Sequence, residues 1–322
     1  MSIIEKAAKR LSELRQAGID LPDRGAGSPR MVESATPTAS TPVRTVQTIA
    51  ELSRAPEFAG VPSAANPFLP ETPVRSRRVE IDLARLARAG YITPDQRRSR
   101  LADEFRVVKR PLLLNAQGKG AAKVDRANLV MVTSSVPGEG KTYASVNLAL
   151  SIAAEFDNTV LLVDADTARP SVMERLGLPR SPGLIDILQS AEPQLSDCML
   201  RTNIDKLTLL PSGSHHDHAT ELLASENMRR LLDDLATKYP DRIIVFDAPP
   251  LLPAPEARVL AARMGQIIFV VAADETSQSA MSEALATIES CPVVMTLLNK
   301  TRRGAGDGYY GYGGGYGYGY GT

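Results

Sequence analysis

Short apolar runs alternate with helix-length segments over the middle of the chain. The runs are rich in β-branched residues and lack a polar face, which predicts strands buried on both sides. They are Leu129–Thr133, Val160–Val163, Leu207–Leu210, Ile243–Phe246, Ile267–Val271 and Val293–Leu298. The helix-length segments are Thr142–Glu155, Glu226–Lys238 and Ser277–Ser290. This alternation predicts an α/β fold with a doubly wound, mostly parallel sheet that binds ligands at the carboxyl ends of its strands.

The two ends of the chain have different patterns. Apolar residues at helical spacing predict an amphipathic helix within residues 1–19, which packs on its own domain or docks to another protein. Nine of the 23 prolines lie before residue 75, so we expect residues 20–78 to be a disordered linker. Periodicity resumes at Val79, which places the folded domain at residues 79–303 and leaves a flexible tail at 304–322.

Composition narrows the class of protein. The 322 residues hold 37 Lys and Arg against 37 Asp and Glu, so the whole chain has no net pull toward nucleic acid or an anionic membrane. The chain has no apolar run of membrane-spanning length, its start does not resemble a signal peptide, and its two cysteines form no metal motif. We therefore expect a soluble cytoplasmic protein. Residues 75–126 carry 14 basic against six acidic residues, but without interleaved aromatics we expect no nucleic-acid partner.

The first buried strand runs directly into SSVPGEGKT and then into a helix, as a phosphate-binding loop requires. Glycines turn the backbone N–H groups inward, Lys141 can reach the β- and γ-phosphates, and the hydroxyl of Thr142 can bind magnesium. The consensus GxxxxGK[ST] fails only at its first position, where Ser135 replaces glycine. The expected nucleotide-binding residues are Ser135, Val136, Pro137, Gly138, Glu139, Gly140, Lys141, Thr142 and Tyr143. Tyr143 is expected to be packed and not to be phosphorylated.

Acidic residues follow two of the predicted strands. Asp164 and Asp166 lie at the end of VDADTARP, and Asp247 precedes Ala-Pro-Pro. Carboxylates at strand ends beside a triphosphate can hold Mg²⁺ and accept a proton. A helix cap is the alternative for Asp166 in particular.

Other polar residues leave alternatives open. His215, His216 and His218 lie in one loop, where a polar surface is favoured over a zinc site. Asn299, at the end of the last strand, could bind a base edge or serve a turn.

The order SVPGEGKT, VDADTARP, DAPP resembles the Walker A, A′ and B motifs of bacterial tyrosine kinases, a branch of the MinD/ParA-like P-loop proteins. The segments SIIEKAAKRL and EFRVVKRPLLLNA are similar to tyrosine autokinases of exopolysaccharide loci. The resemblance implies autophosphorylation with ATP and Mg²⁺, with Lys141, Asp164 and Asp166 as catalytic residues. It also implies that Thr142, Asp164, Asp166 and Asp247 form the metal shell.

The same resemblance implies partners. They are other copies of the chain in a homo-oligomer, a separate membrane activator of the chain-length-determinant type, and a cognate tyrosine phosphatase. The protein would then work at the inner face of the membrane. The family's E-x2-R-x2-R ring helix aligns here with Asp103, Arg106 and Lys109, which keep the charge signs but not the residue types.

The tail GDGYYGYGGGYGYGYGT completes the pattern. Its glycine content excludes a packed core, and a flexible segment can thread a hydroxyl into a kinase site. The expected phosphoacceptors are Tyr309, Tyr310, Tyr312, Tyr316, Tyr318 and Tyr320. A self-associating Gly-Tyr segment is the alternative for the tail. The alternative for the whole chain is a MinD/ParA-type ATPase that forms no phosphoprotein.

Overall fold

The computed structural model describes residues 77–96, 98–190, 195–239 and 241–301. The chain divides into two units, Met1–Pro67 and Phe68–Thr322, and all the described residues belong to the second. The expected N-terminal helix, nearly all of the expected linker and the tyrosine-rich tail lie outside the described residues. The first described element is a strand that begins at Arg77, two residues before the expected start of the folded domain.

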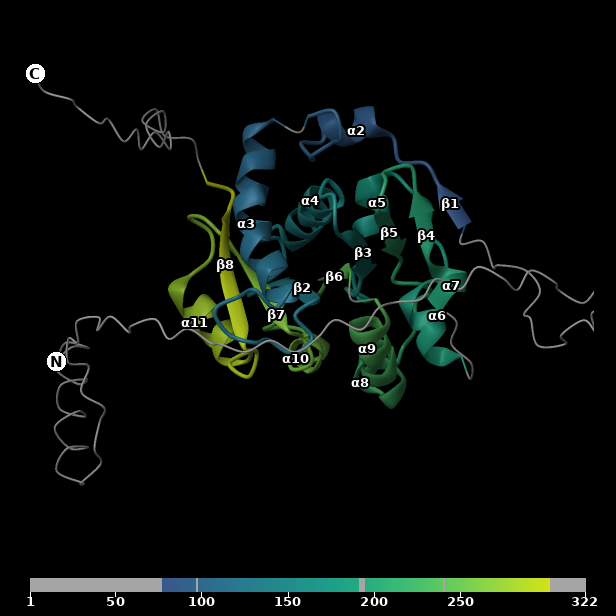
Figure 1. Ribbon diagram of the computed structural model, residues 1–322. Coiled ribbons are helices and arrows are strands. Elements are labelled where there is room, and N and C mark those ends of the chain that lie inside the picture. The colour runs from purple at the N-terminus through teal and green to yellow at the C-terminus, as the bar shows by residue number, and fades with distance from the viewer. Residues whose placement is uncertain (1–76, 97, 191–194, 240, 302–322) are drawn as a thin grey trace, which may run out of the picture. The chain divides into compact units, whose positions relative to one another are not determined.

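The described strands form one eight-stranded sheet in the order β1-β4-β5-β3-β6-β2-β7-β8 (Figure 1). Every neighbouring pair is parallel except β4 and β5. The strands are β1 (Arg77–Val79), β2 (Leu129–Ser134), β3 (Thr159–Asp164), β4 (Leu200–Thr202), β5 (Leu207–Leu210), β6 (Arg242–Asp247), β7 (Gln266–Ala272) and β8 (Val293–Asn299). The fold is therefore the doubly wound, mostly parallel sheet that the apolar runs predicted.

Helices cover both faces of the sheet. On one face pack α2 (Leu83–Arg88), α3 (Arg100–Ala116), α4 (Lys141–Ala153) and α5 (Val172–Leu176). On the other pack α6 (Leu184–Gln189), α7 (Leu195–Cys198), α8 (Ala219–Ala224), α9 (Glu226–Lys238), α10 (Pro255–Ala261) and α11 (Gln278–Ala286). Alternate residues of a central strand enter different cores. In β2, Val130 and Val132 face the α4 side, whereas Leu129 and Met131 face the α9 side.

Serines begin three of the described helices by accepting a backbone hydrogen bond in the first turn. The hydroxyl of Ser99 accepts from Ala102 at α3, that of Ser225 from Met228 at α9, and that of Ser277 from Ala280 at α11. These caps fix the starts of helices whose apolar faces then pack on the sheet.

The edges of the sheet differ from the expectation. All six expected strands are present, but β8 is not buried on both sides, because Val294 and Leu298 are 37% and 59% exposed. As an edge strand, β8 packs only its alternate residues, Met295 and Leu297, on the α3 side. The three-residue strands β1 and β4 carry exposed arginines, so they lack the apolar run that identifies a buried strand.

The strand order creates a crevice at the carboxyl ends of the central strands. The connection from β2 to β3 passes β6 in one direction along the sheet. The connection from β6 to β7 passes β2 in the opposite direction. Connections that leave in opposite directions open a crevice between them, where ligands bind in doubly wound folds.

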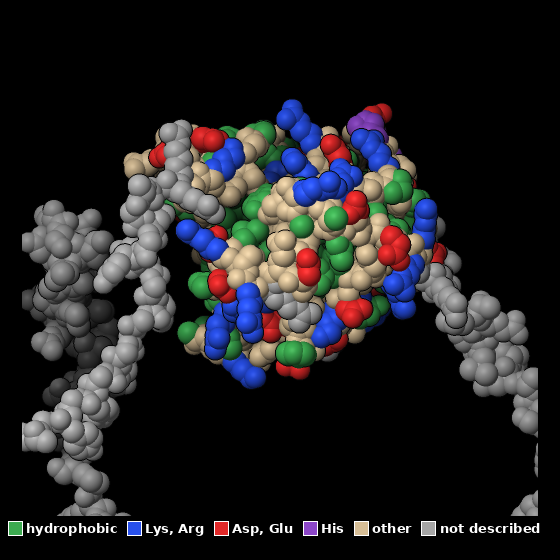
Figure 2. Space-filling model, turned by 90° about the horizontal axis from the view of Figure 1, so that it is seen from above, with side chains coloured by type: hydrophobic (Ala, Val, Ile, Leu, Met, Phe, Trp, Pro, Cys, Tyr) green, Lys and Arg blue, Asp and Glu red, His purple; other side chains and the backbone are tan. Residues whose placement is uncertain are grey.

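The surface is of mixed charge. Lys and Arg side chains are interspersed with Asp and Glu over the face seen in Figure 2, in keeping with equal numbers of acidic and basic residues. Among the described helices, none is both long and apolar enough to cross a membrane.

Candidate nucleotide-binding site

The loop between β2 and α4 lies in the crevice. Gly138 and Gly140 have φ angles of 91° and 99°, a left-handed conformation that residues with a Cβ atom rarely adopt. A Cβ atom on Gly140 would also collide with the side-chain amide of Asn299. The backbone therefore requires glycine at this position, directly before the first helical residue, Lys141. The resulting N-terminus of α4 is suited to bind an anion.

Glu139 ties this loop to the last two strands. Its buried carboxylate accepts a hydrogen bond from the Val136 backbone at 2.8 Å and another from the hydroxyl of Thr276, which follows β7. The side-chain amide of Asn299, at the end of β8, donates to the Glu139 carbonyl at 2.9 Å. Asn299 therefore braces the phosphate loop. The role of Glu139 as an anchor could not be predicted, since Thr276 and Asn299 lie far away along the chain.

Lys141 pairs with a carboxylate of its own chain. Its ammonium group lies 2.5 Å from a carboxylate oxygen of Asp166, and Asp166 is buried. The second oxygen of Asp166 accepts from the Arg169 backbone at 3.0 Å, a local bond like that of a cap. Asp166 therefore closes a turn, in keeping with the cap alternative, and it also pairs with the lysine of the loop. Its expected role as a magnesium ligand and catalytic residue stays a prediction.

Asp164 and Asp247 are register partners at the ends of β3 and β6. Both are buried, and among the described residues one oxygen of Asp164 and both of Asp247 lack a hydrogen-bond partner. Burial, followed by the charge of Asp247, raises the pKa of Asp164 to about 8. Burial also raises the pKa of Asp247 to about 6, and the charge of Lys141 opposes that rise. Unpartnered buried carboxylates are costly and call for a cation.

The chemistry of these groups fits magnesium. The hydroxyl of Thr142 lies 3.0 Å from that of Ser171 and beside Asp247, whose pKa it lowers. Mg²⁺ binds through one or two carboxylates together with water and phosphate oxygens. Such a site needs no full protein cage, and the described residues hold no group of three or more His, Cys, Asp or Glu side chains arranged for a metal. Asp166 points to Lys141 instead.

The histidine loop is a polar surface. His215 and His218 have largely exposed side chains, and the rings of His216 and His218 lie 5.7 Å apart at a tilt. With no metal-holding group in the described parts of the chain, nothing in the structure supports the zinc alternative for this loop.

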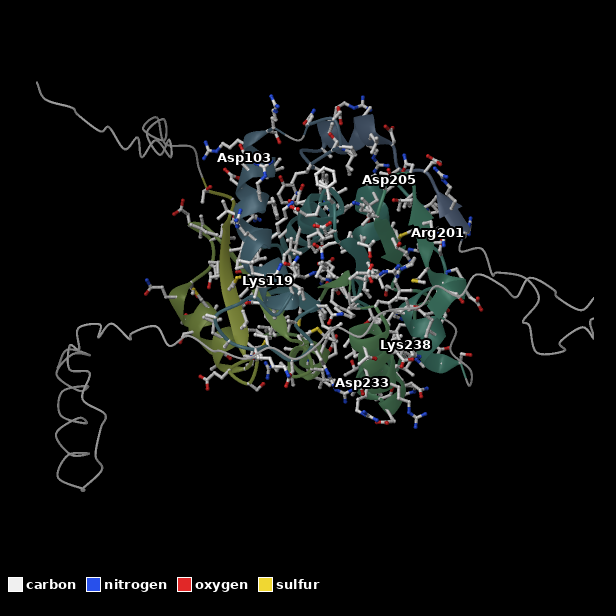
Figure 3. All side chains as sticks on the ribbon, viewed as in Figure 1. Asp103, Lys119, Arg201, Asp205, Asp233 and Lys238 are labelled. Carbon is white, nitrogen blue, oxygen red and sulfur yellow. The ribbon has the colours of Figure 1, made fainter. Side chains whose placement is uncertain are left out.

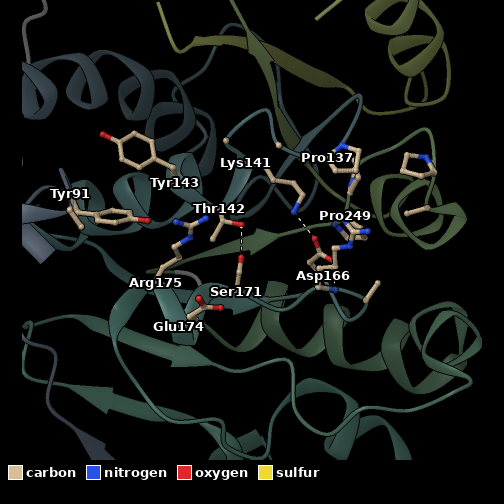
Figure 4. A pocket seen from close by; sticks show the side chains of 18 of the residues that line it. Tyr91, Pro137, Lys141, Thr142, Tyr143, Asp166, Ser171, Glu174, Arg175 and Pro249 are labelled. Atoms are coloured by element: carbon tan, nitrogen blue, oxygen red, sulfur yellow. Dashed lines mark hydrogen bonds and ion pairs between the residues drawn. The ribbon is translucent and has the colours of Figure 1, made fainter. Parts of the chain in front are cut away.

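A cavity of about 650 Å³ opens beside the loop (Figure 4). Pro137, Lys141, Thr142 and Asp166 line it at the phosphate loop, and the Pro249-Pro250 segment lines it after β6. The cavity continues past Thr142 toward α2 and α5. Its farther lining includes Arg85, Tyr91, Tyr143, Glu174 and Arg175, which the sequence did not single out, apart from Tyr143.

Tyr143 is packed, as expected. Its hydroxyl donates to the Gly90 carbonyl at 2.8 Å, and its ring centroid lies 5.1 Å from that of Tyr91. The two rings join the first turn of α4 to the segment after α2.

The three expected ring-contact residues of α3 differ in exposure. Asp103, labelled in Figure 3, and Arg106 form an exposed ion pair on the helix. Lys109 is only 5% exposed, and its ammonium group bonds to the Ser151 carbonyl at 2.6 Å and to Glu155 at 2.5 Å. Its charge is thus engaged within its own chain, which differs from the expectation of a surface contact.

The fold, the glycine loop and the buried carboxylates together define a P-loop nucleotide-binding protein. A family model described as an AAA domain matches residues 128–299, more than half of the chain. The tyrosine-protein kinase CpsD of Streptococcus pneumoniae is 37% identical over 164 residues, which cover 50% of this chain and 69% of that protein. The tyrosine-protein kinase YwqD of Bacillus subtilis is 30% identical over 59% of this chain and 81% of that protein.

A solved structure agrees with these relatives. The kinase domain of the Escherichia coli tyrosine kinase ETK matches with a TM-score of 0.51 and 27% identity, over 60% of this chain and 73% of that one. The chain belongs to the bacterial tyrosine-kinase family, whose members here have the P-loop ATPase fold. In three longer relatives, the matched region spans about a quarter of the protein or less.

Proposed function

We propose that this protein is a tyrosine autokinase that transfers the γ-phosphoryl group of Mg-ATP to its own C-terminal tyrosines. Lys141 and the loop backbone would bind the phosphates, and Thr142, Asp164 and Asp247 would hold a magnesium ion that balances the phosphate charge. The tyrosyl oxygen forms a bond to the γ-phosphorus, the bond to the bridging oxygen breaks, and ADP leaves. Asp164, at the end of β3, accepts the phenolic proton as the new bond forms.

The observation that carries this proposal is the pair of unpartnered buried carboxylates beside Lys141 and Thr142. Among the described residues, one oxygen of Asp164 and both oxygens of Asp247 have no hydrogen-bond partner, and a cation would compensate for their burial. A catalytically silent scaffold would have no reason to bear that cost.

The origin of the tail supports the choice of acceptor. The last strand ends at Asn299, which contacts the phosphate loop through Glu139, and Tyr309 follows ten residues later. Ten residues span at most about 33–36 Å. The tyrosines are therefore within reach of a nucleotide site, in the same subunit or in a neighbour. We favour transfer between subunits.

The wider role follows from the sequence resemblance. We propose that residues 79–303 form the kinase domain, that residues 1–19 form a docking helix joined by the linker 20–78, and that residues 304–322 are the substrate tail. Exposed Asp103, Arg106 and Val107 of α3 would contact neighbouring copies in a ring. The protein would regulate exopolysaccharide production or export at the inner membrane face, with a membrane activator and an opposing tyrosine phosphatase.

Labelled ATP and Mg²⁺ test the activity on the purified chain. We expect label on the wild type, and no label on Lys141→Met or on a chain ending at Arg303. Steady release of phosphate without labelled protein would instead identify a MinD/ParA-type switch ATPase.

A mixing experiment tests the direction of transfer. Lys141→Met supplies an intact tail without activity, and the chain ending at Arg303 supplies activity without a tail. Transfer between subunits predicts label on the Lys141→Met chain in the mixture. If the mixture stays unlabelled while the wild type is labelled, transfer occurs within one subunit.

A further inference from the structure

The nucleotide cavity has a cationic end that the transfer reaction itself does not use. Arg175, on α5, and Arg85, on α2, line the cavity beyond Thr142. In the part of the chain that the structure describes, neither guanidinium group pairs with a carboxylate, and Arg85 donates only to the Glu174 carbonyl, at 3.4 Å. Arginines without a carboxylate partner at a cavity wall are available to an anionic ligand.

Aromatic rings adjoin these arginines. Figure 4 shows the side chain of Arg175 between Tyr91 and Thr142, with Tyr143 close by. Burial raises the pKa of Tyr91, and the positive charge of Arg175 opposes that rise. We call Arg85, Arg175 and Tyr91 the arginine end of the cavity.

The chemistry of the arginine end selects its ligand. Guanidinium groups bind phosphate through paired N–H donors, and aromatic rings pack against a phenyl ring. Glu174 also lines this end, so a ligand must bring enough negative charge to outweigh that carboxylate. The unmodified tail cannot, because its only acid is Asp307. A phosphotyrosine can, because it carries about −1.5 to −2 charges at neutral pH.

We propose that the arginine end binds a phosphotyrosine of the tail, made in an earlier turnover, and so positions the next tyrosine for transfer. The proposal rests on the proposed kinase function and names a specificity site for it. Tail phosphorylation then accelerates after the first phosphate.

The spacing of the tail suits this arrangement. Tyr316, Tyr318 and Tyr320 alternate with glycine, and Tyr310 and Tyr312 have the same spacing. Side chains two apart in an extended chain point to the same side, about 6.6–6.8 Å from each other. A phosphorylated residue and the next acceptor therefore face the cavity together. One can occupy the arginine end while the other approaches the γ-phosphate.

Intact-mass measurement of the full chain during autophosphorylation tests the proposal. In the wild type we expect the singly phosphorylated form to stay minor, because it reacts faster than the unmodified chain. In Arg175→Ala the ratio of multiply to singly phosphorylated chains should fall by about tenfold, as expected for the loss of a charge-assisted contact. Arg175→Lys should restore part of that ratio, since it keeps the charge but loses the paired donors.

The matched control is Arg88→Ala, because Arg88 is an exposed arginine of α2 that does not line the nucleotide cavity. It should leave the distribution of phosphorylated forms as in the wild type. If Arg175→Ala slows all steps equally and leaves the ratio unchanged, Arg175 acts on the phosphates of ATP and the proposal is wrong. Failure of the proposed function would give a different result: a wild-type chain that acquires no phosphate at any time would refute the kinase activity itself.

Discussion

Replacing Asp164 by asparagine should stabilise the nucleotide-free protein at neutral pH. Asp164 is buried beside Asp247, and burial followed by that neighbouring charge raises the pKa of Asp164 to about 8. The amide of Asp164→Asn can still accept the hydrogen bond that Val172 donates at 3.0 Å. It carries no charge, so it removes both the cost of ionisation and the repulsion of Asp247.

The sign and size of the effect follow from linkage. A raised acid pKa means that the folded protein binds this proton more tightly than the unfolded chain does. The resulting stability is complete below the ordinary pKa of aspartate and is lost as the pH rises through about 8. One pKa unit corresponds to about 1.4 kcal/mol, so relative to Asp164→Asn the wild type should lose on the order of 3 kcal/mol between about pH 5 and about pH 7.

Urea unfolding across this pH range, with magnesium chelated, measures the difference between the two proteins. Asp157→Asn is the matched control, because Asp157 is an exposed aspartate in the turn before β3. Its stability should follow that of the wild type. Mg-ATP should stabilise the wild type and fail to stabilise Asp164→Asn. A difference that stays constant with pH, or an Asp164→Asn variant that is less stable at neutral pH, would refute the reasoning.

Three further substitutions test the loop and its supports. Gly140→Ala should weaken ATP binding in calorimetry and lower the free energy of unfolding by about 1–2 kcal/mol, because the left-handed backbone at this position disfavours a Cβ atom. The added Cβ atom would also displace the side chain of Asn299. Unchanged ATP affinity would mean that the loop geometry is dispensable. Glu139→Gln should weaken ATP binding by about tenfold, because an amide cannot accept hydrogen bonds through both of its terminal atoms, as the carboxylate does from the backbone and from Thr276; wild-type affinity would exclude Glu139 as an anchor. Lys109→Met should lower the free energy of unfolding by about 1–3 kcal/mol in urea, since two buried polar contacts are lost; a neutral result would show that the ion pair only offsets its own desolvation.

The central strands and the glycine loop were predictable because their signals are local. A run such as Leu129–Thr133 is apolar at every side chain but the last, and the SSVPGEGKT segment follows it immediately. The acids at the ends of β3 and β6 were predictable for the same reason, since each directly follows an apolar run. The sequence also placed both on one edge, because parallel strands end together.

Features that depend on distant contacts could not be predicted. Lys109 reads as a surface charge on an amphipathic helix, yet its stem is buried against the end of α4, which lies 42 residues further along the chain. The anchoring of Glu139 by Thr276 spans 137 residues. The position of Arg175 at the cavity depends on how α5 packs, which its neighbours in the sequence do not indicate. Such pairings arise from tertiary packing, and no spacing rule within one segment encodes them.

In the ion pair between Lys141 and Asp166, the carboxylate of Asp166 competes with phosphate for the ammonium group of Lys141. A phosphate that binds the ammonium group of Lys141 must either displace the carboxylate of Asp166, which lies 2.5 Å away, or share the ammonium group with it. Because Asp166 belongs to the same chain, its carboxylate acts like a competing ligand at high local concentration. It therefore lowers the affinity of the site for weakly bound anions such as free phosphate. A triphosphate, with many simultaneous contacts to the loop, can overcome that competition. When a triphosphate takes the place of Asp166 at the ammonium group of Lys141, the carboxylate of Asp166 is released from the ion pair.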